Sequence, residues 1–381
     1  MNPTSKIKPL IVNLSVLVFT LVIAAFAAEL VLRMLVNSMD YLSPELIQDE
    51  FLGYRIVPNS GHYDAWGFRN KRVPKKADIV TIGDSQTYGD GARASDSWPG
   101  QLQRLTGKKV YNLSLGGYGP AQYLYLLENR AMQLNPETVI VGLYPGNDFM
   151  DAFEMVYGYD FWKDWRSPGF EAADYLHKRF GQIISFNRHP ALGSAGRWLQ
   201  IHSVLYNLAS LSFVRLRKGH REDARLNTKF SFVETNEAHY QIGFKAAHRL
   251  IESNYEDPNI KEGQRIAFRI ISRMNDICMQ RGINFVVLLI PIKEHIYSKY
   301  IDNSSSDLLK QVVNNEIRLR KMVVTFLEEN NIRFIDPLED LQYAADLVRV
   351  YSYSPNDHPN INGYRIIAEE VARNLLPAKN P

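Results

Sequence analysis

Short apolar runs alternate with longer amphipathic segments along most of this 381-residue chain. The apolar runs lie at 78–83, 109–115, 138–144, 284–290 and 332–336, and each has the length and composition of a buried strand. The intervening segments predict helices over 97–105, 121–134, 262–281 and 307–329, with a last helix over 362–375. This alternation predicts an α/β fold, a three-layer α/β/α sandwich around a mostly parallel, five-stranded sheet. In such sheets the functional site lies at the carboxyl ends of the strands.

The first 40 residues contain a segment suited to a membrane. No charged side chain occurs from Leu10 to Ala28, and this apolar stretch is long enough to cross a bilayer as a helix. Lys6 and Lys8 precede it, so the positive-inside rule predicts a cytoplasmic N-terminus and an extracytoplasmic, periplasmic body. The sequence therefore predicts a single-pass membrane protein with an N-terminal transmembrane helix.

The same segment also fits a cleavable signal peptide, because Ala25-Phe26-Ala27 matches the small-residue cleavage pattern. A retained anchor is favoured, since the apolar pattern continues from Leu30 to Leu35. Secretion after cleavage is the alternative. Both interpretations export the remainder of the chain.

The strand and helix pattern divides the chain into four parts. Residues 1–40 are expected to form the anchor and stalk, and 41–150 and 261–381 the two halves of one α/β domain. Residues 151–260 break the pattern and are interpreted as a largely helical insertion or cap. Its first 20 residues are rich in aromatic side chains, which either stack on sugars, line an acyl pocket or pack the cap onto the core. A basic stretch at 178–225 fits an anionic membrane surface, an acidic polymer as partner, or a solvated face.

Overall composition excludes several classes of protein and site. The chain has 44 Lys and Arg against 41 Asp and Glu, a balance that gives no indication of a nucleic-acid partner. Its one cysteine, Cys278, excludes an intramolecular disulfide and a cysteine-rich zinc site. A Walker loop, a His-Glu-x-x-His motif and a dinucleotide-binding glycine fingerprint are all absent. We therefore expect neither a metal nor a cofactor.

A serine directly follows the first buried strand, in Gly83-Asp84-Ser85. A serine at that position presents its hydroxyl at the carboxyl end of a strand, with its own N–H group beside it. The Gly-x-Ser-x-Gly elbow of ordinary α/β hydrolases is absent from the chain. Ser85 is the candidate nucleophile.

The loops after the next two strands carry groups that would complement this serine. Gly117 follows the second strand and Asn147 the third, and both offer N–H donors for the oxyanion of a tetrahedral ester intermediate, together with the Ser85 N–H. His358 lies after the last strand and just before the last helix, where it is the histidine best placed to act as general base.

The order and spacing of these four blocks resemble the SGNH hydrolases, also called GDSL esterases. The resemblance covers about 77–150 and 282–376. It implies a flavodoxin-like α/β fold and a metal-free serine acyl transfer from an oxygen ester, with nucleophile Ser85, oxyanion donors Ser85, Gly117 and Asn147, and base His358. The anchor, the run 64–69 and the run 290–294 resemble a membrane-anchored bacterial branch found with surface polysaccharides.

One block departs from the family pattern. The family usually places an aspartate two or three residues before the histidine, but here position 355 is proline and position 356 is asparagine. The nearby acid is Asp357, adjacent to His358, and neighbouring side chains on extended backbone point apart. One interpretation is that Asp357 orients the imidazole through a turn. The other is that a backbone carbonyl or a more distant acid holds His358, which gives a Ser–His dyad.

Three functions are compatible with this pattern. The first is an esterase that removes O-acyl groups, expected to be acetyl, from a cell-envelope glycan through an acyl-enzyme. The second is an O-acyltransferase that passes the acyl group to a polysaccharide hydroxyl, together with a membrane-bound acyltransferase partner. The third is a non-catalytic glycan-binding module, which the retention of Ser85, Gly117, Asn147 and His358 argues against.

Overall fold

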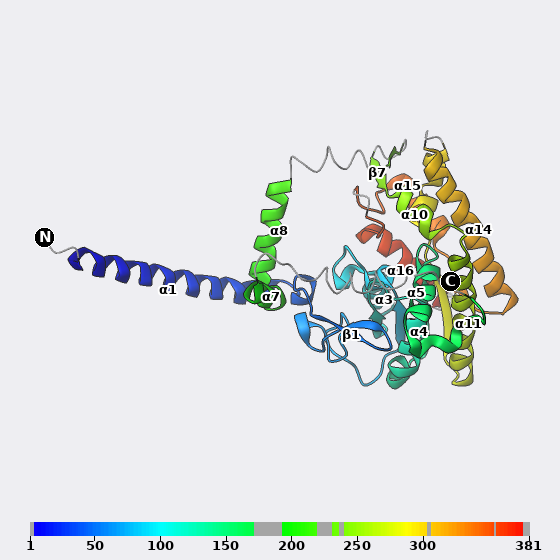
Figure 1. The fold of residues 1–381 in the computed structure, drawn as a ribbon, viewed down its shortest axis with the longest axis horizontal. Coiled ribbons are helices and arrows are strands. Elements are labelled where there is room, and N and C mark those ends of the chain that lie inside the picture. The colour runs from blue at the N-terminus through cyan, green and yellow to red at the C-terminus, as the bar shows by residue number, and fades with distance from the viewer. Residues whose placement is uncertain are drawn as a thin grey trace, which may run out of the picture.

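The computed structural model describes residues 4–170, 193–218, 231–235, 240–302, 306–353 and 356–375. An α/β body carries a long N-terminal helix, α1, that projects away from it (Figure 1). Helix α1 spans Thr4–Leu35.

The centre of the body is a five-stranded sheet in the order β4-β3-β5-β8-β9, in which all neighbouring strands are parallel. The strands are β3 (Ile79–Gly83), β4 (Val110–Ser114), β5 (Thr138–Leu143), β8 (Asn284–Leu289) and β9 (Phe334–Ile335). The predicted parallel sheet is confirmed. Strand β9 is shorter than the five residues predicted, because only Phe334 and Ile335 pair with β8.

Helices cover both faces of the sheet and form the predicted three layers (Figure 1). Successive strand residues alternate between two cores, with Val80 and Ile82 in one and Ile79 in the other. The first core is completed by α4 (Pro120–Asn129), α5 (Asp148–Gly158) and α11 (Pro258–Gln280). The second is completed by α3 (Trp98–Thr106), α14 (Asp307–Glu329), α15 (Leu338–Leu347) and α16 (Ile361–Leu375), with the short α12 (Lys293–Ile296) and α13 (Ser298–Asp302).

Local signals explain several of these boundaries. The Ser97 side chain accepts a hydrogen bond from the Gly100 N–H, and so caps α3 as expected for this residue type. Helix α4 ends five residues earlier than predicted, and a 3-10 turn over Ala131–Leu134 replaces its last part. A small antiparallel hairpin, β1 (Leu46–Asp49) and β2 (Gly53–Ile56), precedes the sheet and was not predicted.

The insertion contains helices and one hairpin. Its described elements are the 3-10 helix Asp160–Trp165, α7 (Gly193–His202), α8 (Val204–Lys218), the pair β6 (Ser231–Glu234) and β7 (Gln241–Phe244), and α10 (Ala246–Glu252). Helix α5 crosses residue 151, where we expected the insertion to begin, and packs on α11 in the main core. The basic stretch 178–225 lies outside the described residues except for 193–218.

The aromatic residues at the start of the insertion pack onto the first core. Trp162 is buried, and its indole N–H donates to the Phe51 carbonyl oxygen at 2.9 Å. The Phe170 ring contacts the rings of Phe153 and Tyr157. Of the three alternatives given for the aromatic residues, packing of the insertion onto the core is therefore the one that describes Trp162 and Phe170.

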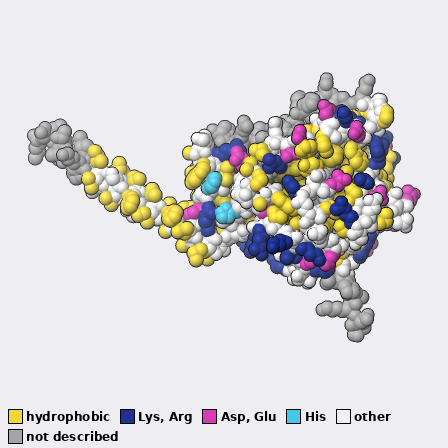
Figure 2. All heavy atoms as spheres, turned by 90° about the horizontal axis from the view of Figure 1, so that it is seen from below, with side chains coloured by type: hydrophobic (Ala, Val, Ile, Leu, Met, Phe, Trp, Pro, Cys, Tyr) yellow, Lys and Arg dark blue, Asp and Glu magenta, His cyan; other side chains and the backbone are white. Residues whose placement is uncertain are grey.

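Helix α1 has the properties expected of a membrane span. The most apolar 18-residue window of the span Ile11–Leu35 has a mean hydropathy of 2.5, and none of that window is buried within the protein. In a space-filling view the coloured side chains along α1 are mostly hydrophobic up to its junction with the body (Figure 2). One helix of the described chain is thus long and apolar enough to cross a membrane.

Candidate active site

Ser85 is the first residue of a short helix, α2 (Ser85–Tyr88), that starts where β3 ends. The turn is held by Asp84, whose carboxylate accepts a hydrogen bond from the Gln86 N–H at 2.8 Å. Gly83 and Gly142 leave room for the Thr87 side chain, since a Cβ at either position would lie within 2.3 Å of Thr87 Oγ1. This turn from β3 into α2, called the serine elbow below, therefore places Ser85 at the carboxyl end of a central strand.

His358 meets this serine from the other end of the chain. Its Nε2 lies 2.8 Å from Ser85 Oγ, although 273 residues separate the two in sequence. The histidine sits in the loop before α16, which a bridge between Tyr351 and Pro359 closes. The structure thus brings the predicted nucleophile and the predicted base within hydrogen-bond distance.

The side chain that holds the other ring nitrogen belongs to Asn356. Its Oδ1 lies 2.6 Å from His358 Nδ1 and also accepts from the His358 backbone N–H at 3.2 Å. This second bond is an Asx turn, and it requires the amide oxygen, not the nitrogen, to face His358. His358 Nδ1 must then carry the proton, which leaves Nε2 as an acceptor for the Ser85 hydroxyl. Asn356 therefore selects the tautomer that a general base needs.

Asp357, the predicted orienting acid, is not brought to the imidazole. Its carboxylate lies 3.1 Å from Arg249 Nη2 and 3.6 Å from Lys245 Nζ, on the far side of the loop. Asp357 and His358 are adjacent in sequence, and adjacent side chains on extended backbone point in opposite directions. The Asp357 carbonyl oxygen instead accepts from Gln86 Nε2 at 3.1 Å, which ties the histidine loop to the serine elbow.

The two loops expected to supply oxyanion donors flank the elbow. A Cβ at Gly116 would lie 3.5 Å from the Ser85 Cβ, so the loop after β4 runs beside the serine. Gly117 has a φ of +79°, a conformation that favours glycine. In the part of the chain that the structure describes, neither the Ser85 nor the Gly117 N–H donates to another protein group. Both remain available to a ligand.

Asn147 directly precedes α5, on the opposite side of the elbow. Its amide nitrogen donates an N–H to Asp151 Oδ2 at 2.8 Å, and the same amide lies against the Asp84 carboxyl, whose pKa this contact lowers. Asp148 braces the same loop by accepting from the Tyr144 N–H and the Tyr123 hydroxyl, each at 2.7 Å. Burial raises the pKa of Asp84 to about 7 and also raises the pKa of Asp148, while the hydrogen bonds that each carboxyl accepts oppose the shift.

The electrostatic surroundings of His358 favour its neutral form. Burial lowers the pKa of its imidazole below the usual value, while the carboxylates of Asp90 and Asp357 oppose that shift. Asp90 Oδ2 lies 3.8 Å from Nδ1 and its side chain is more than half exposed. The imidazole is thus available as a base at neutral pH.

Asp90→Asn is expected to make the imidazole a weaker base. The Asp90 carboxylate stabilises the charged imidazolium, so its removal lowers the pKa of His358 further. The acid limb of kcat/KM should therefore move to lower pH, and the difference from wild type should shrink at high salt, because Asp90 is exposed. A pH–rate series at two salt concentrations measures this, and a limb shifted to higher pH would show that the sign is wrong.

Two buried cations that the sequence did not single out as site residues hold the histidine loop. Arg249, from α10 in the insertion, pairs with Glu252 at 2.8 Å and Asp357 at 3.1 Å and donates to the Gly146 carbonyl oxygen at 2.7 Å. It therefore joins the Asn147 loop to the His358 loop.

Lys293, in the run 290–294, donates to the carbonyl oxygens of Gly243 and Asn356, at 2.7 and 3.1 Å. The sequence feature that could have indicated this role is the charged pair Lys293-Glu294, which lies shortly after an apolar strand.

Lys293→Met should loosen the Asn356 turn and slow the reaction. The substitution keeps the volume but leaves two buried carbonyl oxygens without their donor, at a cost of about 1 to 3 kcal/mol of unfolding free energy. We expect a lower kcat with little change in KM, since Lys293 acts through Asn356 and not on the substrate. Lys299→Met, which removes an exposed lysine paired with Asp346, is the control and should leave both constants unchanged. Wild-type kcat in Lys293→Met would refute the positioning role.

Among the described residues, no group of three or more His, Cys, Asp or Glu side chains is arranged to hold a metal ion. The chemistry available at this site is that of a serine, a neutral imidazole and N–H donors.

No family model and no curated protein matches this chain. Solved structures with a similar arrangement include a lipolytic protein of the G-D-S-L family from Desulfitobacterium hafniense, with 15% identity, 79% of this chain and 100% of that chain covered, and a TM-score of 0.38. A G-D-S-L family member from Veillonella parvula has 12% identity, coverage of 78% and 97%, and a TM-score of 0.35. A catalytic mutant of an acetylxylan esterase from Geobacillus stearothermophilus has 11% identity, coverage of 79% and 94%, and a TM-score of 0.34.

Proposed function

We propose that this protein is a serine esterase of the SGNH type that works through an acyl-enzyme. The observation that carries the proposal is the chain of contacts from Ser85 Oγ to His358 Nε2 and from His358 Nδ1 to Asn356 Oδ1, at 2.8 and 2.6 Å. It combines a nucleophile, a base of the right tautomer and a group that orients the base.

In the first half of the reaction, Ser85 Oγ attacks the acyl carbonyl carbon and His358 Nε2 takes the hydroxyl proton. The oxyanion accepts hydrogen bonds from the N–H groups of Ser85 and Gly117 and from the Asn147 side-chain amide. His358 then gives its proton to the leaving alcohol oxygen as the carbon–oxygen ester bond breaks. The acyl group remains on Ser85.

In the second half, His358 takes a proton from an acceptor hydroxyl, which attacks the acyl-enzyme. With water as acceptor the product is a carboxylic acid, and with a sugar hydroxyl it is a new ester. Asn356 carries no charge, so the imidazolium that forms twice in this cycle is balanced by the more distant carboxylates of Asp90 and Asp357.

We propose an O-acetyl ester of a cell-envelope carbohydrate as the substrate, with water as the acceptor. Support comes from the resemblance of the anchor and the runs 64–69 and 290–294 to the polysaccharide-associated branch, and from α1, which is suited to hold the site beside a membrane. The same helix favours the transferase alternative, because a membrane-bound acyl donor would then be close. In this proposal the N-terminus is cytoplasmic and the α/β body extracytoplasmic.

The full chain in detergent, incubated with an O-acetylated oligosaccharide and an unacetylated acceptor, tests this function. We expect free acetate to appear while the acceptor stays unmodified. Acetylated acceptor in place of acetate would establish the transferase, and tight binding of the oligosaccharide without any loss of acetyl groups would establish the binding module.

A further inference from the structure

Helix α8 of the insertion crosses the end of α1 and does not run alongside it (Figure 1). The joint is the Glu29 carboxylate of α1, which accepts hydrogen bonds from the N–H groups of Val204 and Leu205 at 3.0 and 2.9 Å and from the Ser203 hydroxyl at 2.9 Å. Glu29 also pairs with Arg33 at 2.7 Å. An acid from α1 thus caps α8 and sets the direction in which α8 leaves.

This joint lies at the level where a bilayer would end. The uncharged stretch Leu10–Ala28 has 19 residues, about 28 Å of helix at roughly 1.5 Å per residue, close to the roughly 30 Å of a hydrocarbon core. Glu29 and Arg33 follow immediately, and charged and histidine side chains gather where the rod meets the body (Figure 2). If α1 stands along the membrane normal, α8 lies along the membrane surface.

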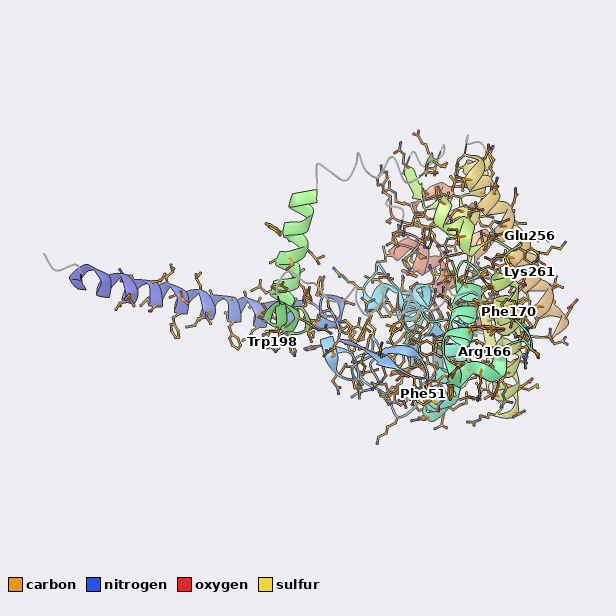
Figure 3. All side chains as sticks on the ribbon, in the orientation of Figure 1. Phe51, Arg166, Phe170, Trp198, Glu256 and Lys261 are labelled. Atoms are coloured by element: carbon orange, nitrogen blue, oxygen red, sulfur yellow. The ribbon has the colours of Figure 1, made fainter. Side chains whose placement is uncertain are left out.

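The joint also exposes large apolar side chains. Trp198 on α7 and Phe213 on α8 are 59% and 62% exposed, and Trp198 lies where α7 and α8 meet the end of α1 (Figure 3). The last turn of α1 adds Met34 and Leu35, both mostly exposed. Tryptophan is the side chain most typical of the membrane–water boundary, and a helix lying there buries apolar side chains among the lipid headgroups.

We propose that α7 and α8 form an interfacial hairpin that rests in the lipid headgroup region and fixes the body relative to the membrane. The hairpin is tied to the body as well as to α1. Arg197 pairs with Glu45 at 3.1 Å, and the Gln200 carbonyl oxygen accepts from the Ser43 N–H at 3.0 Å. A hairpin held from both sides prevents the α/β body from swinging freely on the stalk. This proposal depends on α1 spanning a membrane and not on the esterase chemistry.

Nitroxide accessibility in the full chain, reconstituted into bilayers of phosphatidylcholine and phosphatidylglycerol, tests the hairpin. A spin label is placed at Phe213→Cys on α8, with Val22→Cys on α1 and Leu347→Cys on α15 as lipid and water references, both exposed apolar positions. Native Cys278 is buried and its thiol pKa is raised by that burial, so it should not react. Collision rates with oxygen, which partitions into lipid, and with a water-soluble nickel chelate are measured for each label.

We expect the Phe213 label to resemble the Val22 label, with frequent oxygen collisions and at least tenfold fewer nickel collisions than the Leu347 label. A Phe213 label as open to nickel as the Leu347 label would place α8 in water and overturn the proposal. Protection from both reagents would show protein over α8 and overturn it as well. A Val22 label open to nickel would show that α1 does not span, which removes the premise.

Discussion

Ser85→Ala is expected to reduce hydrolysis of an activated acetyl ester to the background rate. The hydroxyl 2.8 Å from His358 Nε2 is the atom that accepts the acyl group, and a methyl group cannot replace it. Loss of the nucleophile costs about 10⁶-fold in kcat in serine hydrolases. The measurement is initial rate on the purified full chain, compared with wild type at equal concentration.

Ser95→Ala is the matched control for this prediction. Ser95 is an exposed serine in the same part of the chain, and its replacement should leave the rate unchanged. Thermal unfolding of both variants shows whether the fold is retained. Ester hydrolysis by folded Ser85→Ala at the wild-type rate would exclude Ser85 as nucleophile.

Asn356 substitutions have the second largest expected effect, and they separate orientation from charge. In Asn356→Ala, His358 Nδ1 loses its acceptor and both tautomers become populated, so we expect kcat to fall about 10³-fold, somewhat less than the loss of an orienting aspartate elsewhere. The fold should be kept, because the Asn356 side chain lies at the surface of the site and is only half buried.

Asn356→Asp should keep the geometry and add a charge. A carboxylate at the position of Oδ1 accepts the same Nδ1–H bond and stabilises the imidazolium, which raises the pKa of His358. The acid limb of the pH–rate profile should therefore move to higher pH, opposite to the shift expected for Asp90→Asn. Near wild-type kcat in Asn356→Ala, or an unmoved limb in Asn356→Asp, would show that Asn356 does not orient the base.

The parts of the fold and site that follow from local pattern could be predicted from the sequence. Strands β3, β4, β5 and β8 are short, mostly apolar runs, and parallel strands bring their carboxyl ends to one edge. That geometry placed Ser85, which directly follows β3, at this edge. His358 is separated from β9 by α15, and it was predicted from its position before the last helix and from the family pattern. The fifth strand was predicted less well, because only two residues of the run 332–336, Phe334 and Ile335, pair with β8.

The parts that depend on long-range contacts could not be predicted. Asn356 reaches the imidazole through an Asx turn, and the turn depends on backbone angles that Lys293 stabilises from another loop. Arg249 lies in the insertion, where no periodic pattern marks it, and its burial arises from partners about 100 residues away on each side. Asp357 was the nearest acid in sequence, but Arg249 is its partner in space.

The most direct test of the central proposal is where an ester-mimicking phosphonate attaches. Full-length wild-type protein is treated with an activated phosphonate, digested and analysed by mass spectrometry, beside Asn356→Ala. We expect one phosphonylated peptide with the added mass on Ser85, formed far more slowly in Asn356→Ala. Labelling of another residue, or equal labelling rates in the two proteins, would contradict a Ser85 nucleophile activated by His358 and Asn356.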